Sequence, residues 1–184
     1  MSWVIDPKSC LVIIPCLPIG MMHESLAEWV HRYFDRSQML RIKPARDGSY
    51  PPVVCMRNIV TRDLLTVDRF QAYKNIVWLD NDLQPDHRLN PMFEVEADIV
   101  GAQYDLGSPN PWIQPDSVHA AAMRFSRQVI ESMTAPYWLH EYTEDGTSVR
   151  NCDCGYFVQK AKALGFTVAR AGYSDHGHQR SHCH

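Results

Sequence analysis

Residues 76–82 read IVWLDND, an apolar run that ends in two aspartates with one residue between them. Isoleucine, valine and tryptophan favour strands, and the run is continuous rather than alternating. A continuous run of this kind predicts a strand that is buried on both faces and lies centrally in its sheet. In open α/β sheets, ligands bind beyond the carboxyl ends of the strands. Asp80 and Asp82 therefore mark a candidate binding site at the end of a central strand.

Strand and helix patterns alternate on both sides of this stretch. Short apolar runs bounded by turn residues predict five strands, over residues 11–15, 39–43, 76–80, 97–104 and 166–172. Apolar residues at helical spacing predict four helices, over residues 21–34, 61–75, 118–133 and 154–166. Thr61 is the expected N-cap of the second helix, and Gly165 ends the last. The alternation predicts one α/β domain over 1–184, with a central, mostly parallel mixed sheet flanked by helices.

Composition and charge exclude several classes of protein. Hydrophobic residues make up 45% of the 184 residues, which is enough for a sizeable core in one domain. The net charge of −3 has no large block of one sign, which argues against a general polyanion binder. Apolar runs are shorter than the roughly 20 residues that cross a membrane, and the first residues lack a secretory pattern. We therefore expect a soluble, cytoplasmic protein, in which the cysteines are free thiols or metal ligands.

Asp80 and Asp82 carry the strongest chemical signal. Alternate residues of an extended segment point the same way, so the two carboxylates can converge on one point. Two close like charges repel unless a cation lies between them or one carboxylate takes up a proton. Hard oxygen ligands suit Mg²⁺ or Mn²⁺, which commonly bridge to phosphates. The simpler alternative is a polar turn in which one aspartate caps the next helix.

The segment NIVWLDNDLQPD resembles the metal-binding D-x-D segment of family-2-like nucleotide-sugar glycosyltransferases with the GT-A fold. Further segments are similar to motifs of that family and occur in the same order. LVIIPCLPIG resembles the strand and loop that hold the nucleotide base, and CMRNIVTRDL resembles an Arg-Asn segment near the ribose. HAAAMRFSRQVIESM resembles the stretch that borders the sugar site. DCGYFVQKAKALGF resembles the segment that usually carries an acidic pair, and GHQ resembles the late histidine of the metal site.

The resemblance implies a single Rossmann-like GT-A domain that moves a sugar from a nucleotide-diphosphate donor, with UDP the expected nucleotide. It implies Mn²⁺ or Mg²⁺ as cofactor, with ligands drawn from Asp80, Asp82, His178 and the alternative His176. It implies that donor-binding residues come from three segments: Pro15, Cys16 and Leu17; Arg57 and Asn58; and Asp80 and Asn81. It also implies that Asp153 is the catalytic base for the acceptor hydroxyl. Cys154 stands where the family often has a second acid, so inverting and retaining outcomes both stay open.

The acceptor stays open among a glycan, a protein and a hydroxymethylated DNA base. It would contact the loops around Trp112 and Tyr142 and the C-terminal tail. Six cations could form a basic rim for a polyanion, although each is more commonly found on a solvated helix face: Arg124, Arg127, Lys160, Lys162, Arg170 and Arg180.

Two other functions stay open. A Mg²⁺-dependent nucleotidyl- or phospho-transferase would use the same aspartates, although the chain lacks the GxxxxGK[ST] loop of one such class. A non-catalytic α/β binding module could instead be stapled by zinc. Its ligands would come from Cys152, Cys154, His176, His178, His182, Cys183 and His184, whose spacing departs from common zinc motifs.

Overall fold

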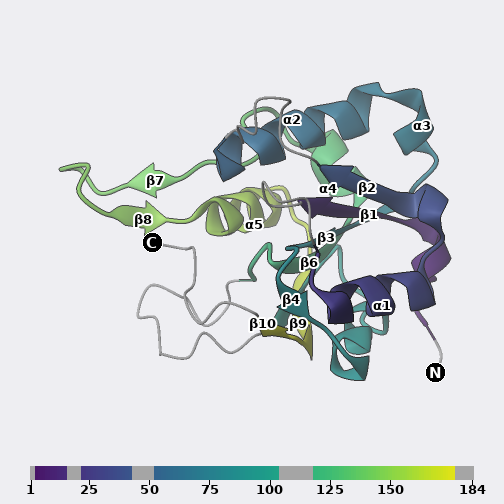
Figure 1. Ribbon diagram of the computed structural model, residues 1–184. Coiled ribbons are helices and arrows are strands. Elements are labelled where there is room, and N and C mark those ends of the chain that lie inside the picture. The colour runs from purple at the N-terminus through teal and green to yellow at the C-terminus, as the bar shows by residue number, and fades with distance from the viewer. Residues whose placement is uncertain (1–2, 16–21, 43–51, 104–117, 177–184) are drawn as a thin grey trace, which may run out of the picture.

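The computed structural model describes residues 3–15, 22–42, 52–103 and 118–176. Within these ranges the main sheet has six strands in the order β2-β1-β3-β6-β5-β9 (Figure 1). Its strands, in chain order, are β1 Cys10–Pro15, β2 Met39–Ile42, β3 Asn75–Leu79, β5 Ile99–Gln103, β6 Ala122–Ser126 and β9 Val168–Tyr173. Two small antiparallel pairs accompany it: β4 Leu83–Gln84 with β10 Asp175–His176, and β7 Glu141–Tyr142 with β8 Val149–Asn151. The mixed α/β sheet confirms the coarse fold prediction.

The main sheet is mixed because β6 runs against both of its neighbours. Strand β1 pairs in parallel with β2 and β3, and β5 pairs in parallel with β9. Strand β6 pairs antiparallel with β3 and β5. Gly101 of β5 also lies so close to Val118 that an added Cβ would meet the valine Cβ at 2.3 Å. Glycine therefore allows the segment that enters β6 to pack tightly on β5.

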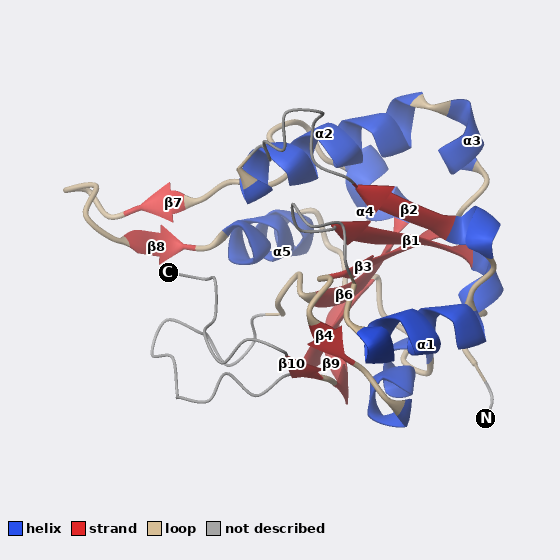
Figure 2. Ribbon diagram, viewed as in Figure 1, coloured by secondary structure: helices blue, strands red, loops and turns tan. Residues whose placement is uncertain are grey.

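Helices cover both faces of the sheet (Figure 2). The helices are η1 Pro7–Ser9, α1 Glu24–Tyr33, η2 Arg36–Gln38, α2 Val53–Thr66, α3 Asp68–Gln71, η3 His87–Phe93, α4 Arg127–Ser132 and α5 Asp153–Ala163. Helices α1 and η3 pack on one face, and α2, α4 and α5 pack on the other. Among the described residues, no helix has the length and apolar character needed to span a membrane.

Strand β3 lies between the two hydrophobic clusters, as its continuous apolar pattern predicts. Ile76 and Trp78 point into the cluster with α2, α4 and α5, while Val77 and Leu79 point into the cluster with α1. All four side chains are at most 1% exposed. Successive side chains of a strand point to opposite faces, so a strand covered on both sides needs apolar residues at every position.

The helix predicted over 118–133 is wrong in its first half. Residues Ala122–Ser126 form β6, and the helix α4 starts at Arg127. Met123 and Phe125 face one hydrophobic cluster, whereas Ala122 and Arg124 point to the opposite face. The small, helix-favouring alanines hid a strand whose conformation depends on pairing with β3 and β5.

The predicted N-cap role of Thr61 is also wrong. Helix α2 begins two turns earlier, at Val53 directly after Pro52, and Thr61 lies inside it. The Thr61 hydroxyl donates a hydrogen bond of 2.8 Å to the carbonyl oxygen of Arg57, one turn back. The loop around Trp112, which the sequence analysis expects to contact the acceptor, lies outside the described residues.

Candidate functional site

Asp80 follows the last residue of β3 and begins the turn that leads into β4. Its backbone N–H donates to the carbonyl of Ala121 at 2.7 Å, which extends the β3–β6 contact by one residue. One carboxylate oxygen accepts a hydrogen bond from the Trp78 indole at 3.3 Å. The side chain stays 28% exposed, so a ligand at the end of β3 can reach it.

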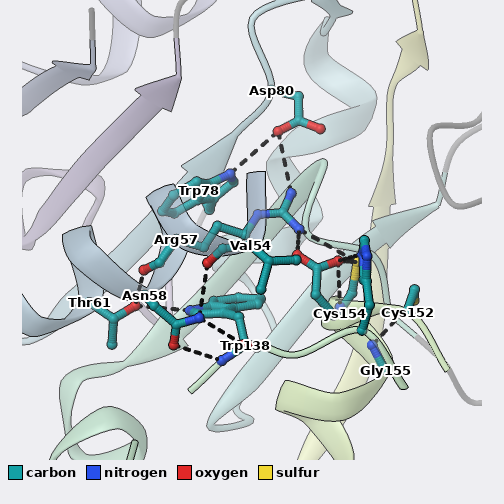
Figure 3. A network of polar contacts seen from close by, with 12 residues as sticks. Val54, Arg57, Asn58, Thr61, Trp78, Asp80, Trp138, Cys152, Cys154 and Gly155 are labelled. Atoms are coloured by element: carbon teal, nitrogen blue, oxygen red, sulfur yellow. Dashed lines mark hydrogen bonds and ion pairs between the residues drawn. The ribbon is translucent and has the colours of Figure 1, made fainter. Parts of the chain in front are cut away.

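Arg57 links Asp80 to Asp153. Figure 3 shows the Arg57 guanidinium between Asp80 and Cys154, the residue that follows Asp153. Its Nη2 lies 3.8 Å from Asp80 Oδ1, and its Nη1 donates to Asp153 Oδ2 at 2.5 Å. The guanidinium also packs 5.4 Å from the ring centroids of both Trp78 and Trp138. Burial would lower the pKa of Arg57, but Asp153, Cys154 and Asp80 together raise it above its usual value. Arg57 is therefore a buried, permanently charged bridge between two of the predicted site residues.

Asp153 is the first residue of α5, and its side chain is almost fully buried. Besides Arg57 it contacts His140, whose Nε2 lies 3.4 Å from Asp153 Oδ1. Burial is the largest influence on the Asp153 carboxyl and raises its pKa, and Cys154 adds to this, while Arg57 and His140 oppose it. The His140 side chain is 29% exposed, so it is the outward-facing member of this pair.

His140 was missed in the sequence because it lies in no motif or periodic segment. It stands between the buried Trp138 and the β7–β8 hairpin, which projects away from the sheet in Figure 1. Its position next to Asp153 depends on a contact across 13 residues that local patterns do not encode.

Asn58 has an internal structural role instead of an exposed one. Its side-chain amide donates to the carbonyls of Val54 and Trp138, and its oxygen accepts from the backbone N–H groups of Tyr137 and Trp138. These bonds fix Trp138 beneath Arg57, where its ring stacks on Phe157 with centroids 4.1 Å apart. The expected contact of Asn58 with a nucleotide would have to compete with these hydrogen bonds.

The turn after β3 lies beside the C-terminal end of the described chain. Strand β4, which begins directly after Asp82, pairs antiparallel with β10, and His176 lies opposite Leu83. The carbonyl of Asn81 accepts a hydrogen bond from His23 N–H at 2.8 Å, which joins the turn to the start of α1. The backbone of His176 is therefore brought next to the D-x-D segment from almost 100 residues away.

Several expected site residues lie outside the described part of the chain: Cys16, Leu17, His178 and Arg180. Pro15 is the last residue of β1 and is partly exposed, at the same end of the sheet as Asp80 because β1 and β3 are parallel.

The prediction that six cations form an exposed basic rim is wrong for two of them, Arg124 and Arg127, because both are buried. Arg124 is 1% exposed and donates to the carbonyls of Met92, Val95 and Ala97. Arg127 is 8% exposed and donates to carbonyls of the α2–α3 region. Both guanidinium groups therefore hold the fold together from within and offer no charge to a polyanionic acceptor.

A different group of side chains could hold a metal. Among the described residues, ligand atoms of His119, Cys152 and Cys154 lie within 4.8 Å of one another. Cys152 and Cys154 belong to the predicted zinc staple, but the imidazole comes from the segment before β6.

No protein-family model matches the chain, and no curated protein matches it at a significant level. Among solved structures, the chain is similar to the crystal structure of A197 from STIV, with a TM-score of 0.54 and 14% sequence identity. The match covers 90% of this chain and 80% of A197. At this identity the similarity bears on the fold alone, and it is consistent with a Rossmann-like α/β architecture.

Proposed function

We propose that the protein is a metal-dependent glycosyltransferase that moves a sugar from a nucleotide-diphosphate donor, with UDP the expected nucleotide, to a hydroxyl acceptor. The observation that carries the proposal is the bridge from Asp80 through Arg57 to Asp153. It joins an acid at the carboxyl end of a central strand to an acid at the start of a late helix, 73 positions further along the chain. These are the two acids that the resemblance to GT-A enzymes assigns to donor binding and to acceptor activation.

The residues at the end of β3 have the right chemistry for Mn²⁺ or Mg²⁺. Asp80 and Asp82 offer hard oxygen donors, and Asp80 is accessible from one side. The pairing of β4 with β10 brings the backbone of His176 beside the same turn, which supports an imidazole from the C-terminal segment as a further ligand. A divalent ion held there would supply Lewis acidity toward the two phosphates of the leaving group.

The Arg57 guanidinium would lie between the two acids and hold each in its place. Its charge lies next to both carboxylates and opposes the increase that burial causes in the pKa of Asp153. Its indole partners, Trp78 and Trp138, hold the guanidinium in place. We therefore assign to Arg57 a positioning role and not the direct contact with the donor that the resemblance implies.

We assign proton acceptance to the Asp153–His140 pair. The carboxylate side chain is 4% exposed and the imidazole 29% exposed, so an acceptor hydroxyl would meet the imidazole first. The proton would pass from the acceptor hydroxyl to His140, while Asp153 orients the ring and compensates its positive charge. In this assignment His140 is the base, and Asp153 positions it instead of taking the proton directly as the resemblance implies.

Calorimetric titration of UDP and UDP-glucose in Mn²⁺, repeated in EDTA, tests the proposal. We expect micromolar binding that EDTA abolishes and that Asp82→Asn weakens at least about tenfold. The matched control is Asp63→Asn, which removes an exposed carboxylate from α2 and should leave binding unchanged.

Donor turnover separates the proposal from its closest alternative. A glycosyltransferase should slowly release UDP from UDP-glucose, and His140→Gln and Asp153→Asn should reduce this rate while donor affinity stays within about threefold. If the Mn²⁺-loaded protein binds no UDP-, GDP- or CMP-sugar, the glycosyltransferase proposal is wrong. Binding of nucleoside triphosphates without any sugar donor would favour the nucleotidyl- or phospho-transferase.

A further inference from the structure

The group formed by His119, Cys152 and Cys154 joins two parts of the chain that lie more than 30 residues apart. His119 lies in the segment that enters β6, whereas Cys152 is the N-cap of α5 and Cys154 is the second residue of that helix. Their ligand atoms all lie within 4.8 Å of one another. His119 and Cys154 are buried and Cys152 is partly exposed, so solvent can reach the group from the Cys152 side.

Two sulfurs and one imidazole nitrogen form a donor set that suits zinc and disfavours Mg²⁺ or Mn²⁺. With Zn–S bonds of about 2.3 Å, neighbouring ligands in a tetrahedral site lie roughly 3.5–3.8 Å apart. The ligand atoms, at most 4.8 Å apart, therefore need to close by about 1.3 Å or less to reach this geometry. Two thiolates also balance the charge of Zn²⁺, so the site can be buried without an unpaired charge.

Each sulfur has a polar neighbour. Cys154 Sγ lies 3.9 Å from Nη1 of Arg57, a permanent cation, and also donates a hydrogen bond of 3.5 Å to Asp153 Oδ1, a proton that zinc would displace. Cys152 Sγ accepts a hydrogen bond of 3.4 Å from the Gly155 backbone N–H in the first turn of α5. Thiolates are stabilised beside cations and at the N-termini of helices, and α5 has 11 residues. The thiolate form is the one that ligates a metal.

We propose that His119, Cys152 and Cys154 bind one zinc ion, with water in the fourth coordination position. The ion ties the start of α5 to the segment entering β6. Asp153 lies between the two cysteines in the sequence, and Asp80 bonds to Ala121, two residues after His119. Zinc at this place would therefore fix the distance between the two acids of the candidate site. The inference concerns a different metal at different residues and does not depend on the proposed glycosyl transfer.

The test is zinc binding to the full chain, freed of metal by a chelator under reducing conditions. We expect one Zn²⁺ per chain, and Co²⁺ in its place should give the absorption of tetrahedral thiolate coordination. His119→Gln and Cys152→Ser should each weaken binding by more than about 100-fold, which exceeds the effect of losing an outer hydrogen bond. Cys55→Ser, at an exposed cysteine in α2, and Asp82→Asn should bind zinc as the unmodified chain does.

Poor folding by itself can weaken the binding of zinc to a variant. The change in unfolding temperature on adding zinc separates this case from the loss of a ligand. Excess zinc should raise the unfolding temperature of the unmodified chain and of Cys55→Ser, but not that of Cys152→Ser. Zinc bound with unchanged affinity by folded His119→Gln and Cys152→Ser would overturn the proposal and put the ligands elsewhere in the chain. A folded, reduced, unmodified chain that binds neither Zn²⁺ nor Co²⁺ would overturn it as well.

Discussion

Arg57 is the residue on which the candidate site depends. Its side chain is 6% exposed and lies among two carboxylates, a thiol and two indoles, which come from β3 and the turn after it, from α5 and from the segment before β7. A buried guanidinium is tolerated when its charge is compensated, and here Nη1 donates to Asp153 while the buried Nε has no acceptor among the described residues. Loss of this one cation would leave a buried carboxylate without its compensating charge.

Replacing Arg57 should therefore destabilise the fold strongly. We expect Arg57→Met to lower the free energy of unfolding by about 3–5 kcal/mol, the usual cost when one partner of a buried ion pair is removed. Urea unfolding followed by tryptophan fluorescence measures this change. The double variant Arg57→Met with Asp153→Asn should recover part of the loss, because it removes the uncompensated charge.

A matched control lies on the same helix. Arg62 is 64% exposed and pairs with its neighbour Asp63, so Arg62→Met should cost less than about 1 kcal/mol. Equal losses for the Arg57 and Arg62 variants would contradict the assignment of Arg57 as a buried bridge.

At the scale of elements, strand β6 differs most from the prediction, because a helix is expected where the strand forms. It carries Arg124 into the cluster on the α1 side, where the guanidinium donates to the carbonyls of Met92 and Val95, both at 2.9 Å, and of Ala97 at 3.3 Å. These carbonyls lie at the end of η3 and in the segment after it. Arg124 thus anchors an irregular stretch of backbone to the middle of the sheet.

We expect Arg124→Met to lower the free energy of unfolding by about 2–4 kcal/mol. The aliphatic part of the side chain is kept, but the carbonyl oxygens lose charged donors, and an unsatisfied buried acceptor costs about 1–3 kcal/mol. Arg150→Met in β8 serves as the control, because Arg150 is an exposed arginine in a strand. Chemical denaturation of both variants measures their free energies of unfolding. If Arg124→Met lowered the free energy of unfolding no more than the control does, the anchoring role would be wrong.

At the scale of the whole molecule, the two hydrophobic clusters share their strands. Trp29 belongs to the cluster on the α1 side and Trp138 to the cluster on the α2 side, while β1 and β3 contribute alternate residues to both. If the helices on one face of the sheet came away, β1 and β3 would be exposed to water. The packing of the other face would then be weakened, because it uses the same strands. We therefore expect the described ranges to unfold as one cooperative unit.

Coincident unfolding transitions test this single-domain prediction. Urea midpoints from far-ultraviolet circular dichroism and from tryptophan fluorescence should agree within error. Single-tryptophan variants that retain either Trp29 or Trp138 should each show one transition, and its midpoint should match that of the same variant's circular dichroism. A fluorescence transition of Trp138 that clearly precedes the loss of strand signal would show that the two faces unfold separately.

Much of the fold could be predicted from the sequence because its signals are local. The run before Asp80 predicts a strand buried on both faces. Apolar residues at helical spacing predict α1 before this strand and α5 after it. Gly165 follows α5 with a φ of 89°, a conformation that glycine adopts without strain. Strand β6 was missed because its alanines favour a helix and its pairing partners lie elsewhere in the chain.

The sequence by itself determined the acid at the end of the central strand, because an apolar run and the charge that ends it are adjacent residues. Only the tertiary structure decided what surrounds that acid. The bridge through Arg57 to Asp153 spans 96 residues, His140 completes it from outside any motif, and His119 meets Cys152 and Cys154 from more than 30 residues away. Such groups are stable in a buried place only when distant segments bring compensating charges and donors, and that compensation exists only in the folded chain.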